Sequence, residues 1–189
     1  MKSFIKDYIK ESISAKNNIL ENNKILELIE ESANIIINTY KNNKKILIAG
    51  NGGSAADAQH IATEFVSKFT KERKALNAIA LTTNTSIITA VSNDYDYSLI
   101  FSRQIEALAQ EGDIFIAIST SGNSENIIKA IKTAKELNLV TIGLVGSKPS
   151  QMDNLCDYLI KVPSDKTSII QESHIMIGHM ICGLVENNL

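Results

Sequence analysis

Cysteines, runs of basic residues and long apolar segments are all scarce in this chain of 189 residues. Cys156 and Cys182 are too few and too far apart for a disulfide framework or a CxxC site, so we expect two buried free thiols. No run of Lys and Arg exceeds two residues, and the net charge is −2. The sequence therefore lacks the basic footprint of a nucleic-acid-binding protein, and no nucleic-acid partner is expected.

No apolar stretch has the length of a signal peptide core or of a membrane span. Charges interrupt the N-terminus at Lys2, Lys6, Asp7 and Lys10, and the later apolar stretches are too short to cross a bilayer. The apolar fraction of 44% and the charged fraction of 21% are ordinary for a globular protein. We therefore expect one cytoplasmic domain over residues 1–189, without membrane contact.

The first part of the chain has the periodicity of helices. Apolar residues recur every four positions from Ile5 to Ile13 and again from Ile25 to Ala33, which predicts helix over residues 3–41. Asn22-Asn23 indicates a break between two helices. Because these helices carry much apolar surface, we expect residues 1–41 to pack partly against another subunit.

From Lys45 onward, short apolar runs alternate with helical segments such as Glu125–Leu137, and a long helix over Thr167–Glu186 closes the chain. Runs that are apolar on both faces are typical of buried parallel strands. The pattern predicts an α/β fold with a doubly wound, five-stranded parallel sheet in the 45–189 core. In a flavodoxin-like order 2-1-3-4-5, the loops after strands 1 and 3 would flank the usual ligand site. The five predicted strands are Ile46–Ala49, Asn77–Leu81, Ile114–Ile118, Val140–Val145 and Tyr158–Val162.

The loop after the first predicted strand is rich in glycine and opens a helix. Its sequence is Gly50-Asn51-Gly52-Gly53-Ser54-Ala55. Glycines let a ligand approach the backbone, and the helix N-terminus offers unpaired N–H groups, although a plain tight turn would look the same. The loop also fits GxGxxG/A, but the second strand ends in Leu81-Thr82-Thr83-Asn84, without the acidic residue that binds a ribose. We therefore exclude a nicotinamide cofactor.

The loop after the third predicted strand carries four hydroxyl groups in six residues, Ser119-Thr120-Ser121-Gly122-Asn123-Ser124. Together with helix N–H donors, these hydroxyls can surround a phosphate without a fixed positive charge. A plain turn would use one or two such residues. Because the chain has no GxxxxGK[ST] sequence, a phosphorylated metabolite fits better than a nucleoside triphosphate.

The histidines lie in predicted helices, where they offer acid–base and metal-binding groups. His60 and Glu64 are four positions apart and share a helix face, an arrangement that also occurs in purely structural pairs. On the closing helix, Glu172 is seven positions from His179 and Gln171 is eight. Spacing alone favours Glu172 as the neighbour of His179, and it does not decide the matter.

Four segments together resemble the phosphoheptose isomerases of the sugar-isomerase (SIS) domain family, and the resemblance covers nearly the whole chain. STSGNS alone would indicate only a SIS domain, whereas HxxxE after GNGGSAADAQ combined with IQExHxxxxH is much more specific. The resemblance implies conversion of sedoheptulose 7-phosphate to an aldoheptose 7-phosphate, the first step toward activated heptose for lipopolysaccharide or capsule. It also implies a homotetramer whose active sites lie between subunits. The four segments are GNGGSAADAQHIATEF, SNDYDY, ISTSGNS and IIQESHIMIGH.

The resemblance also assigns roles to residues. It implies that His60, Glu64, Gln171 and His179 bind zinc, which favours Gln171 over Glu172 and leaves Glu172 and His174 as structural groups. Glu64 and His179 are expected to be the base and the acid. Lys68 stands one turn beyond Glu64, where the family usually has Arg, so its contact with substrate loses the bidentate fork. Asn93 and Asp94, which would otherwise be assigned to a turn, match substrate contacts. Glu64 and Gln171 are expected to contact substrate as well as zinc. The remaining expected substrate-binding residues are Asn51, Gly52, Gly53 and Ser54 at the sugar and Ser119, Thr120, Ser121 and Ser124 at the phosphate.

Two other functions compete with this expectation. The first is a non-catalytic SIS protein that binds a sugar phosphate or the replication initiator, but such relatives lack the full acid–base pair that Glu64 and His179 supply. The second is a SIS isomerase acting on a hexose or pentose phosphate. The shared phosphate loops do not exclude it, whereas HxxxE and IQExHxxxxH argue against it.

Overall fold

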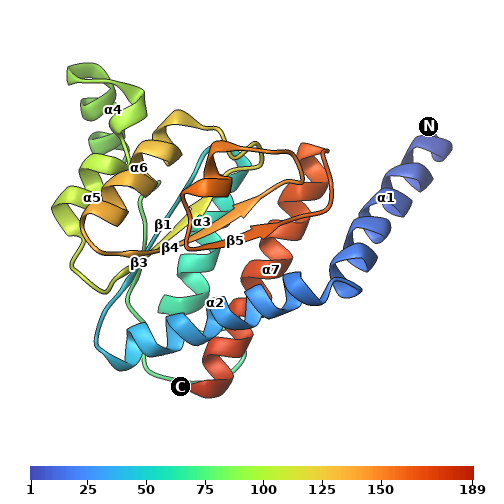
Figure 1. The fold of residues 1–189 in the computed structure, drawn as a ribbon, viewed down its shortest axis with the longest axis horizontal. Helices are drawn as coiled ribbons and strands as arrows, with labels where there is room; N and C mark the ends of the chain where they lie inside the picture. Colours follow the sequence, from blue (N-terminus) through green and yellow to red (C-terminus); the bar gives the residue numbers. More distant parts are fainter.

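The computed structural model describes residues 1–189, and a sheet of five parallel strands lies at its centre (Figure 1). The strand order β2-β1-β3-β4-β5 confirms the expected flavodoxin-like arrangement. The predicted third and fourth strands agree with the structure, while β2 is two residues shorter than predicted because only its centre pairs with β1. The strands are β1 (Ile46–Gly50), β2 (Ala78–Ala80), β3 (Ile114–Ile118), β4 (Val140–Val145) and β5 (Tyr158–Lys161).

Alternation along the strands builds a hydrophobic core on each face of the sheet. Ile46, Ile48 and Ile116 face one way, toward α2, α3 and α7, while Leu47 and Phe115 face α5 and α6 on the other side. Because both faces are covered, the strands are apolar throughout, as the sequence indicated. The helices are α1 (Lys2–Leu20), α2 (Asn23–Lys41), α3 (Gly53–Val66), α4 (Thr85–Asp94), α5 (Ser102–Leu108), α6 (Glu125–Glu136) and α7 (Thr167–Asn188), with 3-10 turns η1 (Tyr97–Leu99) and η2 (Gln151–Asn154).

The predicted break between the first two helices is confirmed. Asn22 caps α2, and its side chain accepts a hydrogen bond from the Ile25 N–H at 3.2 Å. Figure 1 shows α1 extending away from the body of the molecule. Its outer face leaves Phe4 and Ile5 73% and 55% exposed, and Ile9 and Ile13 are also about half exposed. This face is an apolar surface with no partner within the subunit.

Three expectations need correction. Asn93 and Asp94 lie in the last turn of α4 instead of in a turn between elements. Lys68 does not continue the helix one turn beyond Glu64, because α3 ends at Val66 and Ser67 leaves the helical region with φ −83° and ψ −102°. Cys182 is buried but Cys156 is only half-buried, although desolvation raises the pKa of each thiol to about 12.

No helix of the chain combines the length and apolar character needed to cross a membrane.

Candidate active site

Helices α3 and α7 bring His60, Glu64 and His179 into one cluster. The two helices approach closely at Gly178, where an added Cβ would lie 2.7 Å from the Ile61 side chain. His60 Nε2 is 3.2 Å from Glu64 Oε1 and 2.9 Å from His179 Nε2. All three groups offer donor atoms within 4.8 Å of one another. The i, i+4 pair read from the sequence is therefore present, and His179 joins it from a segment more than a hundred residues away.

The donor set of this cluster suits a zinc ion. Two imidazole nitrogens and one carboxylate oxygen are typical of three-ligand zinc sites that keep a fourth position open. The cluster is only partly enclosed, since the His60 side chain is 49% exposed and that of Glu64 is 17% exposed. A ligand or a neighbouring subunit can therefore reach it.

Gln171 lies near the start of α7, about two helical turns before His179. It packs against the start of α3, where a Cβ added to Gly53 would lie 2.5 Å from Gln171 Nε2. Eight residues separate Gln171 from His179, about 12 Å along the axis of α7. The structure brings His60, Glu64 and His179 together, and it places the Gln171 side chain against the glycine-rich loop.

Glu172, which spacing alone favoured as the neighbour of His179, instead anchors α1. It accepts hydrogen bonds from Tyr8 Oη at 2.6 Å and from Ser12 Oγ at 2.5 Å, and Lys16 Nζ lies 3.3 Å away. The Ser12 and Tyr8 hydroxyls hold the pKa of this carboxyl below its usual value. The structural role expected for Glu172 follows from these contacts.

His174 is fully buried, and neither ring nitrogen has a hydrogen-bond partner of normal geometry. Burial lowers its pKa to about 4, and the nearby Val145 backbone offsets only part of that effect. The imidazole is therefore neutral near pH 7.

We expect the neutral state of His174 to make stability depend on pH. Because the folded pKa lies below the unfolded value, the unfolded chain takes up a proton first as pH falls. Stability present above pH 6.5 is lost progressively down through pH 4, by roughly 3 kcal/mol. Denaturant unfolding at several pH values should show a shallower loss for His174→Gln than for wild type over this window. Equal slopes would contradict the assignment.

The hydroxyl-rich loop after β3 forms one side of a polar pocket, to which it contributes Thr120, Ser121 and Asn123 but not Ser119 or Ser124. Ser119 Oγ lies 3.1 Å from Ser124 Oγ and accepts a hydrogen bond from the Gly122 N–H, whose residue has φ +64°. Helices α6 and α7 both begin near this loop without a side-chain cap, so their first N–H groups are available to an anion. The pocket, of about 230 Å³, is lined by Thr120, Ser121, Asn123, Gly146, Ser147, Lys148, Pro149, Ser164, Asp165, Thr167 and Ile170.

Lys148 is a lining residue that sequence reasoning missed, since the phosphate was expected to bind without a fixed positive charge. It follows β4, the neighbour of β3 in the sheet, at the edge where parallel strands end. Ligands of open α/β sheets bind beyond the carboxyl ends of the strands. Applied to the loop after β4 as well as to the loops after β1 and β3, this rule would have identified Lys148. Asp165 is the one acidic residue in the lining.

The glycine-rich loop after β1 is held by polar contacts that the sequence did not reveal. The Asn51 and Asn126 amides exchange hydrogen bonds at 2.8 and 2.9 Å, and Tyr97 Oη donates to Asn51 Oδ1 at 3.1 Å. Gly52 has φ +57°, and a Cβ on Gly50 would lie 2.5 Å from the Ser54 carbonyl oxygen. The tight turn thus requires glycine, and it fixes Asn51 at the carboxyl edge of the sheet.

The other expected substrate contacts are on the surface. Asn93 donates a hydrogen bond to Asp94 at 2.8 Å, and both side chains are exposed at the end of α4. Lys68 Nζ lies 2.7 Å from Glu72 Oε2, on the loop after α3. Ser54 is buried in the first turn of α3, whereas Gly52 and Gly53 are exposed.

Comparison with known proteins gives consistent results across the chain. A family model described as the SIS domain matches residues 7–146. A phosphoheptose isomerase of Clostridium acetobutylicum is 55% identical over 189 residues, covering 100% of this chain and 96% of that protein. One of Aneurinibacillus thermoaerophilus is 57% identical, covering 98% of this chain and 94% of the relative.

Solved structures agree with these sequence relatives. Phosphoheptose isomerase GmhA from Neisseria gonorrhoeae has a TM-score of 0.92 and 38% identity, with 98% of each chain covered. A phosphoheptose isomerase from Francisella tularensis has a TM-score of 0.94 and 37% identity, covering 98% of this chain and 97% of that one.

Proposed function

This chain belongs to the phosphoheptose isomerases of the SIS-domain family, and on that premise we propose that it converts D-sedoheptulose 7-phosphate to D-glycero-D-manno-heptose 7-phosphate. As an aldose–ketose isomerase, it would move a proton between two adjacent carbons through an enediol or enediolate. The observation that carries the proposal is the meeting of Glu64 with His179, within 4.8 Å, on two helices that the family sequence pattern singles out.

Glu64 would act as the base at carbon. In the open-chain ketose it would take a proton from C1 and return that proton to C2. His179 would act at the oxygens, donating a proton to the oxygen on C2 and accepting one from the oxygen on C1. The sum of these transfers moves the carbonyl from C2 to C1 with no net gain or loss of atoms. His179 would also assist opening of the sugar ring.

The phosphate would bind at the pocket formed by the hydroxyl-rich loop. Thr120, Ser121 and Lys148 line this pocket and offer donors to a dianion, together with the N-termini of α6 and α7. The hydroxyls of Ser119 and Ser124, on the same loop and 3.1 Å from each other, would complete the phosphate site. Asn51, Gly52, Gly53 and Ser54, with Asn93 and Asp94, would contact the sugar. Lys68 would contact substrate only after leaving Glu72, a solvated pair that costs little to break.

Zinc would be held by His60, Glu64 and His179, with Gln171 as a fourth ligand. When bound, zinc supplies a Lewis acid that polarises a carbonyl and stabilises an enediolate. Glu64 is a weaker base while it ligates a metal, so its two roles would alternate.

The separation of the groups supports an active site shared between subunits of a homotetramer. Thr167 at the polar pocket and His179 are twelve residues apart on α7, about 18 Å along the axis. His179 also borders an apolar hollow of about 600 Å³ lined by residues that include Leu26, Ile29 and Met180. Together with the exposed face of α1, this hollow would be covered by neighbouring subunits. A heptose product would feed lipopolysaccharide or capsule synthesis.

The non-catalytic alternative fits the site less well, because both acid–base residues are present and adjacent. The choice among sugar phosphates is tested by substrate length. We expect kcat/KM to be highest for the seven-carbon ketose 7-phosphate, and at least about tenfold lower for five- and six-carbon ketose phosphates, because the phosphate pocket and the cluster must be bridged together. Coupled assays with matched concentrations would measure this. A higher kcat/KM for a pentose or hexose phosphate would replace the proposed substrate.

A further inference from the structure

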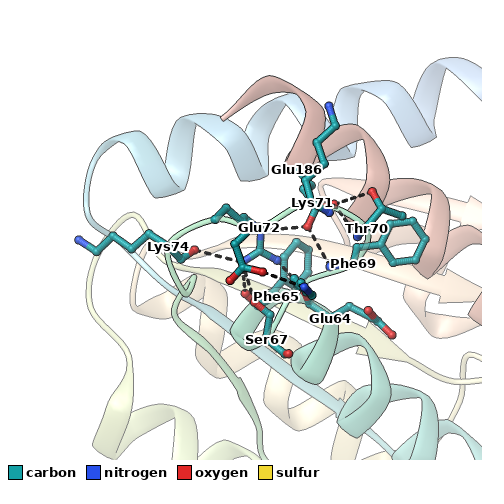
Figure 2. A network of polar contacts seen from close by, with 11 residues as sticks. Glu64, Phe65, Ser67, Phe69, Thr70, Lys71, Glu72, Lys74 and Glu186 are labelled. Atoms are coloured by element: carbon teal, nitrogen blue, oxygen red, sulfur yellow. Dashed lines mark hydrogen bonds and ion pairs between the residues drawn. The ribbon is translucent and has the colours of Figure 1, made fainter.

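Glu186 occupies an unusual position in the last turns of α7. Its side chain is 1% exposed, and the carboxylate accepts hydrogen bonds from the N–H groups of Phe69, Thr70 and Lys71 at 2.7–2.8 Å (Figure 2). The Thr70 hydroxyl donates a fourth bond at 2.8 Å. Burial would raise the pKa of this carboxyl, but the N–H donors outweigh it and lower the pKa to about 2.

The buried Glu186 carboxylate is not explained by its contribution to the stability of the fold. A negative charge near the C-terminus of a helix is opposed by the helix dipole, and a buried charge carries a desolvation cost. The loop that Glu186 holds, residues 67–74, is mostly on the surface, with the Lys68 side chain 52% and the Glu72 side chain 85% exposed. The contacts therefore fix the backbone of an exposed loop that buries few apolar side chains.

Arg73 links this loop to the end of α3. Its Nε lies 3.2 Å from Glu186 Oε1 as an ion pair without hydrogen-bond alignment. Its terminal nitrogens donate to the carbonyl of Glu64 at 2.6 Å and to that of Phe65 at 2.8 Å. These carbonyls lie in the last turn of α3 and have no partner within the helix. Arg73 thus holds the backbone of Glu64 itself.

Phe69 links the same loop to His179. The two rings have centroids 5.7 Å apart and an interplanar angle of 32°. Gly183 makes room for this contact, since a Cβ there would lie 3.3 Å from the Phe69 ring. The loop therefore touches both members of the acid–base pair, through Arg73 at Glu64 and through Phe69 at His179.

We infer that Glu186 and Arg73 form a clamp whose role is to position Glu64 and His179 relative to each other, an inference that rests on the proposed function. Neither residue contacts the reacting groups of the substrate in this scheme, so both are positioning residues. Small displacements of reacting groups can cost about 10²-fold in rate. Glu186→Gln keeps the shape of the side chain but loses the charge and part of the acceptor capacity. It should lower kcat about 10–100-fold and leave KM within about twofold.

Asp113, the residue before β3, offers a matched control away from the acid–base pair. It is also a fully buried carboxylate, which accepts the N–H groups of Lys45 and Gln110 at 2.9 and 2.8 Å and pairs with Lys45 Nζ at 2.6 Å. Asp113→Asn should destabilise the protein without lowering kcat more than about twofold, because Asp113 contacts no part of the acid–base pair. Arg73→Lys keeps the positive charge and loses the fork on the carbonyls, so it should lower kcat as Glu186→Gln does.

A measurement that does not depend on turnover distinguishes failure of the clamp from failure of the proposed isomerase function. The chain has three histidines, so ring-labelled histidine gives three sets of NMR signals, one for each ring. Glu186→Gln should shift those of His60 and His179 but not that of His174, while Asp113→Asn should shift none. If wild type fails to isomerise the substrate but the signals shift as expected, the proposed function is wrong and the clamp stands. If wild type is active, and kcat and signals in Glu186→Gln match those in Asp113→Asn, the clamp is refuted.

Discussion

Replacing Glu64 by glutamine is expected to lower turnover of sedoheptulose 7-phosphate by about 10²–10⁴-fold, the usual contribution of a general base. Glutamine matches glutamate in size and keeps polar contact with His60, which lies 3.2 Å away, but it does not accept a proton from carbon. The phosphate pocket lies elsewhere on the subunit, so KM should change far less than kcat. Steady-state kinetics on purified variant and wild type measure both quantities.

Glu106→Gln is the matched control for this substitution. Glu106 is an exposed glutamate on α5, on the opposite face of the sheet from α3 and α7, and its replacement should leave kcat unchanged within about twofold. If Glu64→Gln turned over at the wild-type rate, Glu64 would not be the base, and α3 would not supply the base of the reaction.

Replacing His179 by glutamine is the second change with a large expected effect. Turnover should again fall by about 10²–10⁴-fold, because proton transfer at the substrate oxygens would lose its acid. The same change removes one of three clustered donors, so the protein should retain less zinc after dialysis against a metal buffer. Activity assays and elemental analysis of the dialysed protein measure the two effects separately.

The double variant tests whether the two residues work together. Groups that act in one step are strongly non-additive, so Glu64→Gln combined with His179→Gln should be little slower than either single variant. A rate loss equal to the product of the single losses would indicate independent roles. Wild-type turnover in His179→Gln with normal zinc retention would show that His179 has neither role.

The sequence predicted the core of this fold because its signals are local or repetitive. Strands such as Ile114–Ile118 are apolar on both faces, and Asn22 caps α2 with its own side chain. The pairing of His60 with Glu64 was likewise predictable, since residues four apart on a helix share a face. The site loops stood out through glycine and hydroxyl content alone.

The rest depends on contacts between distant segments, which periodicity does not report. The end of α3, and with it the position of Lys68, is set where Arg73 takes up the carbonyls of Glu64 and Phe65. Glu186 has no local signature, because its partners lie more than a hundred residues earlier. Spacing favoured Glu172 as the neighbour of His179, but the Glu172 side chain instead accepts hydrogen bonds from Tyr8 and Ser12 of α1.

The most direct test of the account is to incubate the purified, zinc-supplied protein with sedoheptulose 7-phosphate and follow the products by NMR. The account predicts that an aldoheptose 7-phosphate appears until ketose and aldose reach equilibrium, and that the same amount of folded Glu64→Gln forms almost none in that time. Folded wild-type protein that binds the sugar phosphate and leaves it unchanged would contradict the isomerase assignment.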